Sequence, residues 1–265
     1  MTDADLNQFK ELRLKELEVV ELILERLTHP KANILEIGAG AGWQARRLSE
    51  IGYRVEAVEV STSIHKESRE GSIREYDGKN LPYESHYFDV VFSSNTLEHV
   101  EEPAHLNAEI IRVLKKDGYA IHYVPTSTWR ILSLLTYYPA LFKELYQKLS
   151  ARTSKKNYKK SDHNQLNNGI NYSLGFLLLK FMRILVPTKH GAKGSAFGEI
   201  FSFRTSSWIR LFQQMGWKIN DITSNKMLLT GYHLLGARLS IPIRMRLSRI
   251  FGSTAVLFVM SRDKH

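Results

Sequence analysis

A glycine-rich turn that follows an acidic residue is the first stretch of this chain that could do chemistry. Glu36 lies near the end of the apolar run 34–37, and glycine then occupies every second position at Gly38, Gly40 and Gly42. Glycine at a strand exit tolerates positive φ and lets a ligand approach the backbone closely. A carboxylate beside such a turn attracts a cation and repels a diphosphate. The spacing favours a site for a positively charged ligand, with an ordinary tight turn as the alternative.

Two more acidic residues follow at places where nucleotide-binding folds use them. Glu59 ends the alternating run 53–59, at about the 20-residue offset where such folds place an acid on ribose hydroxyls. A carboxylate can accept hydrogen bonds from both hydroxyls, or it can instead cap the following helix. Asp77 and Gly78 follow a weaker strand, where Asp-Gly is also a common turn. The dinucleotide pattern G-x-G-x-x-G fails because position 43 is Trp.

Histidines are the candidate bases, because their side chains titrate near neutral pH. His99, His122 and His190 are considered, and His99 ranks first because it follows the fourth predicted strand. A structural role is the alternative for each of them. The chain has no cysteine and no H-E-x-x-H pattern, so the sequence predicts no disulfide and no metal site.

Alternating strands and helices must position these residues. Apolar periodicity predicts helices at 3–28, 43–51, 61–70, 104–116 and 205–215, and strands at 32–37, 53–59, 72–76, 89–93, 119–125, 217–223 and 255–260. Basic residues and glycine at 115–118 suggest the end of the fourth helix. This alternation predicts an α/β fold with a mostly parallel sheet and helices on both faces.

The glycine turn and the later segment 81–100 resemble class I S-adenosylmethionine-dependent methyltransferases, in particular the type 11-like group that acts on small molecules. Segment 81–100 contains the LPY, FDVV and LEHV patterns of that group, and the resemblance covers about residues 32–125. It implies a Rossmann-like sheet of seven strands in the order 3-2-1-4-5-7-6, with strand 7 antiparallel. It implies S-adenosyl-L-methionine as cofactor, with Asp77 near the adenine and the cofactor held by Glu36, Gly38, Ala39, Gly40, Gly42, Glu59, Val60, Asp77, Gly78 and Asn95.

Two insertions interrupt the expected core. Residues 1–125 and 205–265 are predicted to form the methyltransferase core, with a helical insertion at 226–253, and residues 126–204 a helical lid for the substrate. The lid has an aromatic-rich helical part at 129–149, a polar and basic part at 150–168 that we expect to be mobile, and an apolar part at 172–186. None of these runs is long enough to span a membrane. They could pack on the core, or lie in a membrane interface.

The methyl acceptor is expected to be a small or lipid-linked saccharide or quinone-like molecule, methylated at oxygen. Segments 187–191 and 199–203, which contain His190-Gly191 and Glu199, loosely resemble an H-G…E…F…W segment of methyltransferases of cell-surface polysaccharide and lipid-linked sugar pathways. His99 and His190 are therefore the predicted catalytic residues. The alternatives are a scaffold that has lost catalysis, or a nucleic-acid methyltransferase, which the lack of an N-P-P-Y-type motif disfavours.

Composition limits the choice of partner without deciding it. The formal net charge is +10, which suits an anionic membrane surface, a nucleic acid or an acidic substrate. The N-terminus is charged and polar and does not resemble a signal peptide. We therefore expect a cytoplasmic protein, with attachment to the membrane periphery as an open alternative.

Overall fold

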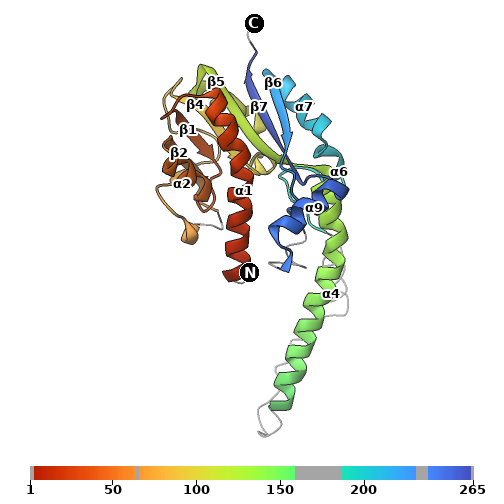
Figure 1. Ribbon diagram of the computed structural model, residues 1–265. Coiled ribbons are helices and arrows are strands. Elements are labelled where there is room, and N and C mark those ends of the chain that lie inside the picture. Colours follow the sequence, from red (N-terminus) through yellow and green to blue (C-terminus); the bar gives the residue numbers. More distant parts are fainter. Residues whose placement is uncertain (1–2, 64–65, 159–186, 231–237, 264–265) are drawn as a thin grey trace.

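One seven-stranded sheet forms the centre of the computed structural model, which describes residues 3–63, 66–158, 187–230 and 238–263 (Figure 1). Its strand order is β3-β2-β1-β4-β5-β7-β6. Only β7 is antiparallel, and it pairs with both β5 and β6. The strands are β1 (Asn33–Ile37), β2 (Arg54–Val60), β3 (Arg74–Tyr76), β4 (Phe88–Ser94), β5 (Leu114–Pro125), β6 (Trp217–Ser224) and β7 (Ala255–Arg262). The predicted fold class and strand order are confirmed.

Helices cover both faces of the sheet, as the alternating pattern predicts. They are α1 (Asp3–Leu27), α2 (Trp43–Glu50), α3 (Pro103–Val113), α4 (Ser127–Tyr158), α6 (Glu199–Ser202), α7 (Thr205–Gln214) and α9 (Ile241–Phe251), with 3-10 turns η1 (Lys66–Ser68) and η2 (Leu97–His99). Side chains of α1 and α2 form one buried cluster with Leu257 and Val259 of β7. Side chains of α3 and α7 form the other cluster with Phe258 and Met260. The period-two alternation of β7 thus builds both layers of the core.

The helix predicted at 104–116 is shorter than expected, because its last residues belong to β5. Leu114 has an extended backbone and pairs with Phe88 of β4. Its side chain is fully buried, and the next residue, Lys115, forms a 2.8 Å ion pair with Asp89 of β4. Pairing with a neighbouring strand therefore overrides the helix-ending chemistry that Lys115 to Gly118 suggests.

The helix predicted at 61–70 is also wrong in the described residues, where only η1 is helical. Contacts with distant residues hold this segment instead. Lys66 and Arg69 both form ion pairs with Glu75. The backbone N–H of Glu70 donates to the carbonyl of Ala41 at 2.7 Å, so the segment closes over the glycine turn.

The predicted lid begins with α4, which projects away from the sheet (Figure 1). The helix is longer than predicted and reaches Tyr158, so 150–158 is helical where a mobile segment was expected. The rest of that segment and the apolar run 172–186 lie outside the described residues. Among the residues that the structure describes, no helix is both long and apolar enough to cross a bilayer. The proposed domain division remains a prediction.

Candidate active site

A cavity of about 710 Å³ lies beyond the carboxyl ends of β1, β2 and β4. Parallel strands end at the same edge of a sheet, so the loops that follow them meet there. Most of the predicted site residues line this cavity: Gly38, Ala39, Gly40, Glu59, Val60, Asp77, Gly78, Asn95 and His99. Glu36, Gly42 and His190 are not among the lining residues.

The glycine turn after β1 can form only with glycine at its tightest positions. Gly38 has φ +75°, and a Cβ there would lie 2.3 Å from Thr96 Oγ1. Gly42 has φ +83°, and a Cβ there would lie 2.5 Å from the carbonyl oxygen of Glu70. The N–H groups of Gly38 and Ala39 both donate to the carbonyl of Val58 on β2. The turn is therefore hydrogen-bonded to β2 on one side and packs against the loop after β4 on the other. Its backbone forms part of the cavity wall.

Glu59 joins the end of β2 to the glycine turn. Its side chain is buried at the cavity wall, and Oε2 accepts the N–H of Gly40 at 2.7 Å. Oε1 accepts the N–H of Val60 at 2.9 Å. Each carboxylate oxygen has a further lone pair, so the group can still accept hydrogen bonds from a ligand in the cavity.

Glu36 lies beneath the turn rather than on the cavity wall. The residue is only 1% exposed, and its Oε2 has no hydrogen-bond partner. Burial raises the pKa of Glu36 to about 8, opposed by a hydrogen bond from the N–H of Ala45 and helped by the charge of Glu59. A buried acceptor without a donor costs free energy, so it favours a donor or a cation above it.

Asp77 and Asn95 also line the cavity. Asp77 lies in a hydrogen-bonded turn, and Asn95 has a left-handed backbone conformation. Asp77 Oδ1 accepts the N–H groups of Lys79 and Asn80, and these bonds lower the pKa of Asp77 to about 2. Asp77 thus forms the turn that the sequence offers as an alternative, and the residue also lines the cavity. Asn95 has φ +52°, and its N–H donates to the carbonyl of Tyr123.

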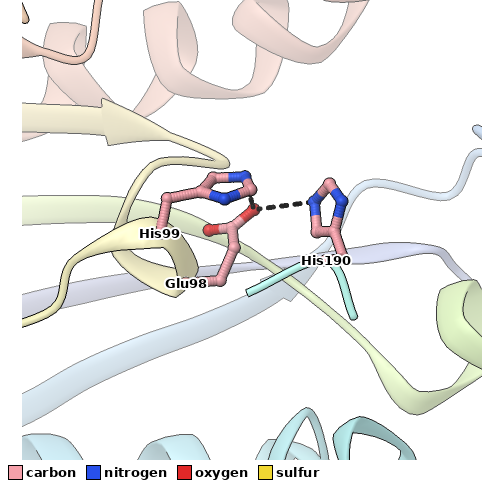
Figure 2. A group of neighbouring side chains, drawn as sticks. All are labelled: Glu98, His99 and His190. Carbon is pink, nitrogen blue, oxygen red and sulfur yellow. Dashed lines mark ion pairs between the residues drawn. The ribbon is translucent and has the colours of Figure 1, made fainter. Parts of the chain in front are cut away.

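Two of the three candidate histidines lie together near one end of the cavity. The rings of His99 and His190 touch edge to face with centroids 4.5 Å apart, and the Glu98 carboxylate lies beside both of them (Figure 2). Both rings are partly exposed, whereas the Glu98 side chain is fully buried. Burial lowers the pKa of His99, partly offset by the charge of Glu98. The third, His122, is 1% exposed and bonds Ser93 Oγ at 2.8 Å. Burial lowers its pKa to about 3, which excludes it as a base near neutral pH.

Comparison with known proteins agrees with this geometry. Residues 35–122, which span β1 to most of β5, match the family model described as a methyltransferase domain. This segment is therefore similar to methyltransferase domains. An uncharacterized methyltransferase of Mycolicibacterium gilvum is 31% identical over 94 residues, which cover 33% of this chain and 37% of that protein. The chain thus matches about a third of the length of such a relative.

Two further similarities bear on the fold and on the domain. A glycine/sarcosine/dimethylglycine N-methyltransferase of Actinopolyspora halophila is 31% identical over 110 residues, covering 37% of this chain and 20% of that protein. The crystal structure of an S-adenosylmethionine-dependent methyltransferase from Mesorhizobium loti superposes with a TM-score of 0.53 at 14% identity. That superposition covers 94% of this chain and 98% of the other, and at this identity it shows a shared fold alone.

S-adenosylmethionine is the cofactor that the methyltransferase domain implies, and the residues present fit it. The orphaned Oε2 of Glu36 under the turn suits an ammonium group. Glu59, at the end of β2, has free acceptor capacity toward the cavity for hydroxyl donors. Among the described residues that line the cavity, the basic side chains are Arg13, Lys79 and His99, which do not form an arginine-rich phosphate cradle.

Sequence reasoning did not identify the residues of α1 and α2 that also line the cavity. Phe9 and Arg13 of α1, and Trp43 and Gln44 of α2, line it. The Phe9 and Trp43 rings pack edge to face, with their centroids 6.3 Å apart. The periodicity of α1 predicts a core-facing helix, but it carries no signal that the first turns of α1 reach past the core to the cavity.

A Glu36→Gln variant tests the environment under the turn. The folded-state pKa is about 8 and the unfolded value about 4.5, so between these pH values the folded state holds a proton that the unfolded state releases. The contribution of Glu36 to the free energy of unfolding is therefore largest below pH 4.5 and decreases as the pH rises toward 8. We expect Glu36→Gln to remove this slope, worth on the order of a few kcal/mol, in urea unfolding at several pH values. A slope unchanged in the variant would contradict the burial argument.

Proposed function

We propose that the chain is an S-adenosylmethionine-dependent methyltransferase that methylates a hydroxyl of a small or lipid-linked acceptor. The observation that carries this proposal is the arrangement of one cavity. Glu59 and the glycine turn lie at one part of its wall, and His99 lies at another. Sulfonium methyl groups are already activated, so the protein's work is to align the acceptor and to remove its proton.

Each group of the chain has a role in this proposal. Glu59 and Asp77 hold hydroxyl and amino groups of the adenosyl part, and Glu36 faces the cationic end from beneath. Asn95 and the turn residues shape the wall by their backbone. His99, with its pKa lowered by burial, is neutral near pH 7 and can accept the hydroxyl proton. His190 lies beside it.

Binding of S-adenosylmethionine and S-adenosylhomocysteine, measured by calorimetry, tests the proposal first. Binding of both with one site per chain supports it. No binding of either would favour the alternative of a scaffold that kept the fold. A nucleic-acid acceptor has less support, because β4 ends at Ser94 and continues into Asn95 and Thr96 instead of a motif for base amino groups.

A lipid-linked acceptor is favoured by the position of α4. The helix starts next to His190, where the centroids of the Trp129 and His190 rings lie 4.4 Å apart. Farther along, one face carries large exposed apolar side chains at helical spacing: Ile131, Leu135, Tyr138, Phe142 and Tyr146. Such a stripe can lie in a membrane interface and bring a lipid-linked head group to the cavity. Arg244 of α9 takes no part, because it is buried and donates to backbone carbonyls.

Flotation with anionic liposomes at low salt tests this part of the proposal. We expect the protein to float, and a Leu135→Ser/Phe142→Ser variant to bind at least about tenfold more weakly, because two exposed apolar side chains are lost. Leu22→Ser on α1 is the matched control, since Leu22 is also an exposed apolar residue. A protein that stays with the soluble fraction, or a control that weakens binding equally, would refute membrane attachment through α4.

A further inference from the structure

Glu98, His99 and His190 form a compact group of metal-ligating side chains. The Nε2 atoms of both histidines lie 3.8 Å from Glu98 Oε1. One ligand atom from each of the three residues lies within 4.8 Å of the others. Figure 2 shows the carboxylate next to both rings. They come from η2 and from the segment before α6, which lie about ninety residues apart in the chain.

The carboxylate at the centre of this group lacks the partners that burial demands. The Glu98 side chain is fully buried, and neither of its oxygens has a hydrogen-bond partner. A separation of 3.8 Å from each histidine is too long for a hydrogen bond. Burying a carboxylate without donors is costly, and a bound cation removes that cost.

A buried network fixes His190 against η2. Glu199 Oε1 accepts the N–H groups of both His190 and Gly191 at 2.7 Å. Glu199 Oε2 lies 2.9 Å from Arg130 Nε, whose guanidinium also donates to backbone carbonyls. The N–H of Ala192 donates to the carbonyl of Glu98. Position 191 admits no side chain, because a Cβ there would lie 2.8 Å from that same carbonyl oxygen.

We propose that Glu98, His99 and His190 bind one divalent transition-metal ion of the zinc type at the edge of the methyltransferase cavity. Two imidazoles and one carboxylate suit zinc or ferrous iron, whereas magnesium and calcium prefer oxygen ligands. Metal–ligand bonds of about 2.1 Å place tetrahedral ligand atoms roughly 3.4 Å apart. Each histidine Nε2 atom, now 3.8 Å from Glu98 Oε1, must move closer by about 0.4 Å, and the three ligand atoms, which lie within 4.8 Å of one another, must close by at most about 1.4 Å. This set leaves coordination positions open beside the partly exposed rings.

The role of the ion rests on the proposed function, although its binding does not. An acceptor hydroxyl at an open position would become more acidic, as metal-bound water does. The proton would leave to solvent. The oxygen would attack the methyl carbon, so that an O–C bond forms as the C–S bond breaks and S-adenosylhomocysteine leaves as a neutral thioether. His99 would then be a ligand rather than the base. The sequence alone does not predict this metal site, because two of its ligands come from the loop after β4 and the third comes from a distant segment.

Titration of the untagged, chelator-treated protein with Co²⁺, followed by visible absorption, tests metal binding directly. We expect one Co²⁺ per chain, with d–d bands typical of four or five ligands, and displacement by Zn²⁺. His99→Ala, His190→Ala and Glu98→Gln are each expected to abolish these bands, whereas His29→Ala, which changes an exposed histidine between α1 and β1, should leave them intact. Glu199→Gln, which loosens His190, should weaken binding about 10–100-fold.

Calorimetry with S-adenosylhomocysteine on the same variants separates this proposal from the proposed function. Variants that lose the Co²⁺ bands but still bind S-adenosylhomocysteine support a metal site distinct from the cofactor site. Absent bands in the wild type, or bands that persist in the His190→Ala and Glu98→Gln variants, would overturn the metal site, and retained cofactor binding would leave the proposed function standing.

Discussion

A Glu59→Ala variant is expected to bind S-adenosylhomocysteine at least about 10²-fold more weakly than the wild type. Two effects add in this variant. The ligand loses a carboxylate that can accept from two hydroxyls, each bond being worth roughly 1.5–3 kcal/mol. The N–H of Gly40, which donates to Glu59 Oε2 at 2.7 Å, also loses its acceptor, so the turn is less well held. Calorimetry measures the change.

Two companion variants separate loss of charge from loss of structure. Glu59→Gln keeps the size and one acceptor oxygen, and should bind more weakly than the wild type but more tightly than Glu59→Ala. Glu56→Ala removes an exposed carboxylate from the same strand and should bind normally. Equal affinity of Glu59→Ala and the wild type would show that this carboxylate does not hold the ligand.

The sheet and the cofactor end of the cavity could be predicted from the sequence because both depend on local signals. Apolar runs define β1, β2 and β4, and those of β1 and β2 end at glycine or acid. Parallel pairing brings the carboxyl ends of the three strands to one edge. These signals are enough to place the glycine turn next to Glu59, which accepts the N–H of Gly40. The resemblance to methyltransferases supplied the strand order, which local signals alone leave open.

Long-range contacts were the part that the sequence did not reveal. Leu114 joins β5 because Phe88 offers it a pairing partner, although the preceding residues read as a helix. Glu98 and His190 are likewise brought together by the buried Glu199–Arg130 pair, and no periodicity reports such a contact. The same holds for Phe9, whose place on the cavity wall depends on how α1 packs on the sheet.

A Gly38→Ala variant is expected to lose measurable cofactor binding and several kcal/mol of stability. The new Cβ would lie 2.3 Å from Thr96 Oγ1, 2.4 Å from Cγ2 and 2.9 Å from Cβ, so rotation of the Thr96 side chain cannot relieve the contact. The backbone at φ +75° also disfavours alanine. Either the turn or the loop after β4 must shift, and both line the cavity. Calorimetry and thermal unfolding measure the two losses.

The matched control is Gly52→Ala, where φ is +108° and nothing lies within 4 Å of the added Cβ. That variant carries the backbone strain alone, about 1–3 kcal/mol, and should bind S-adenosylhomocysteine as the wild type does. A Gly38→Ala/Thr96→Gly double variant removes the steric contact and should recover part of the lost binding. If Gly38→Ala binds normally, or if the double variant recovers nothing while it remains folded, the close approach of Gly38 to Thr96 is not what shapes the ligand-binding wall.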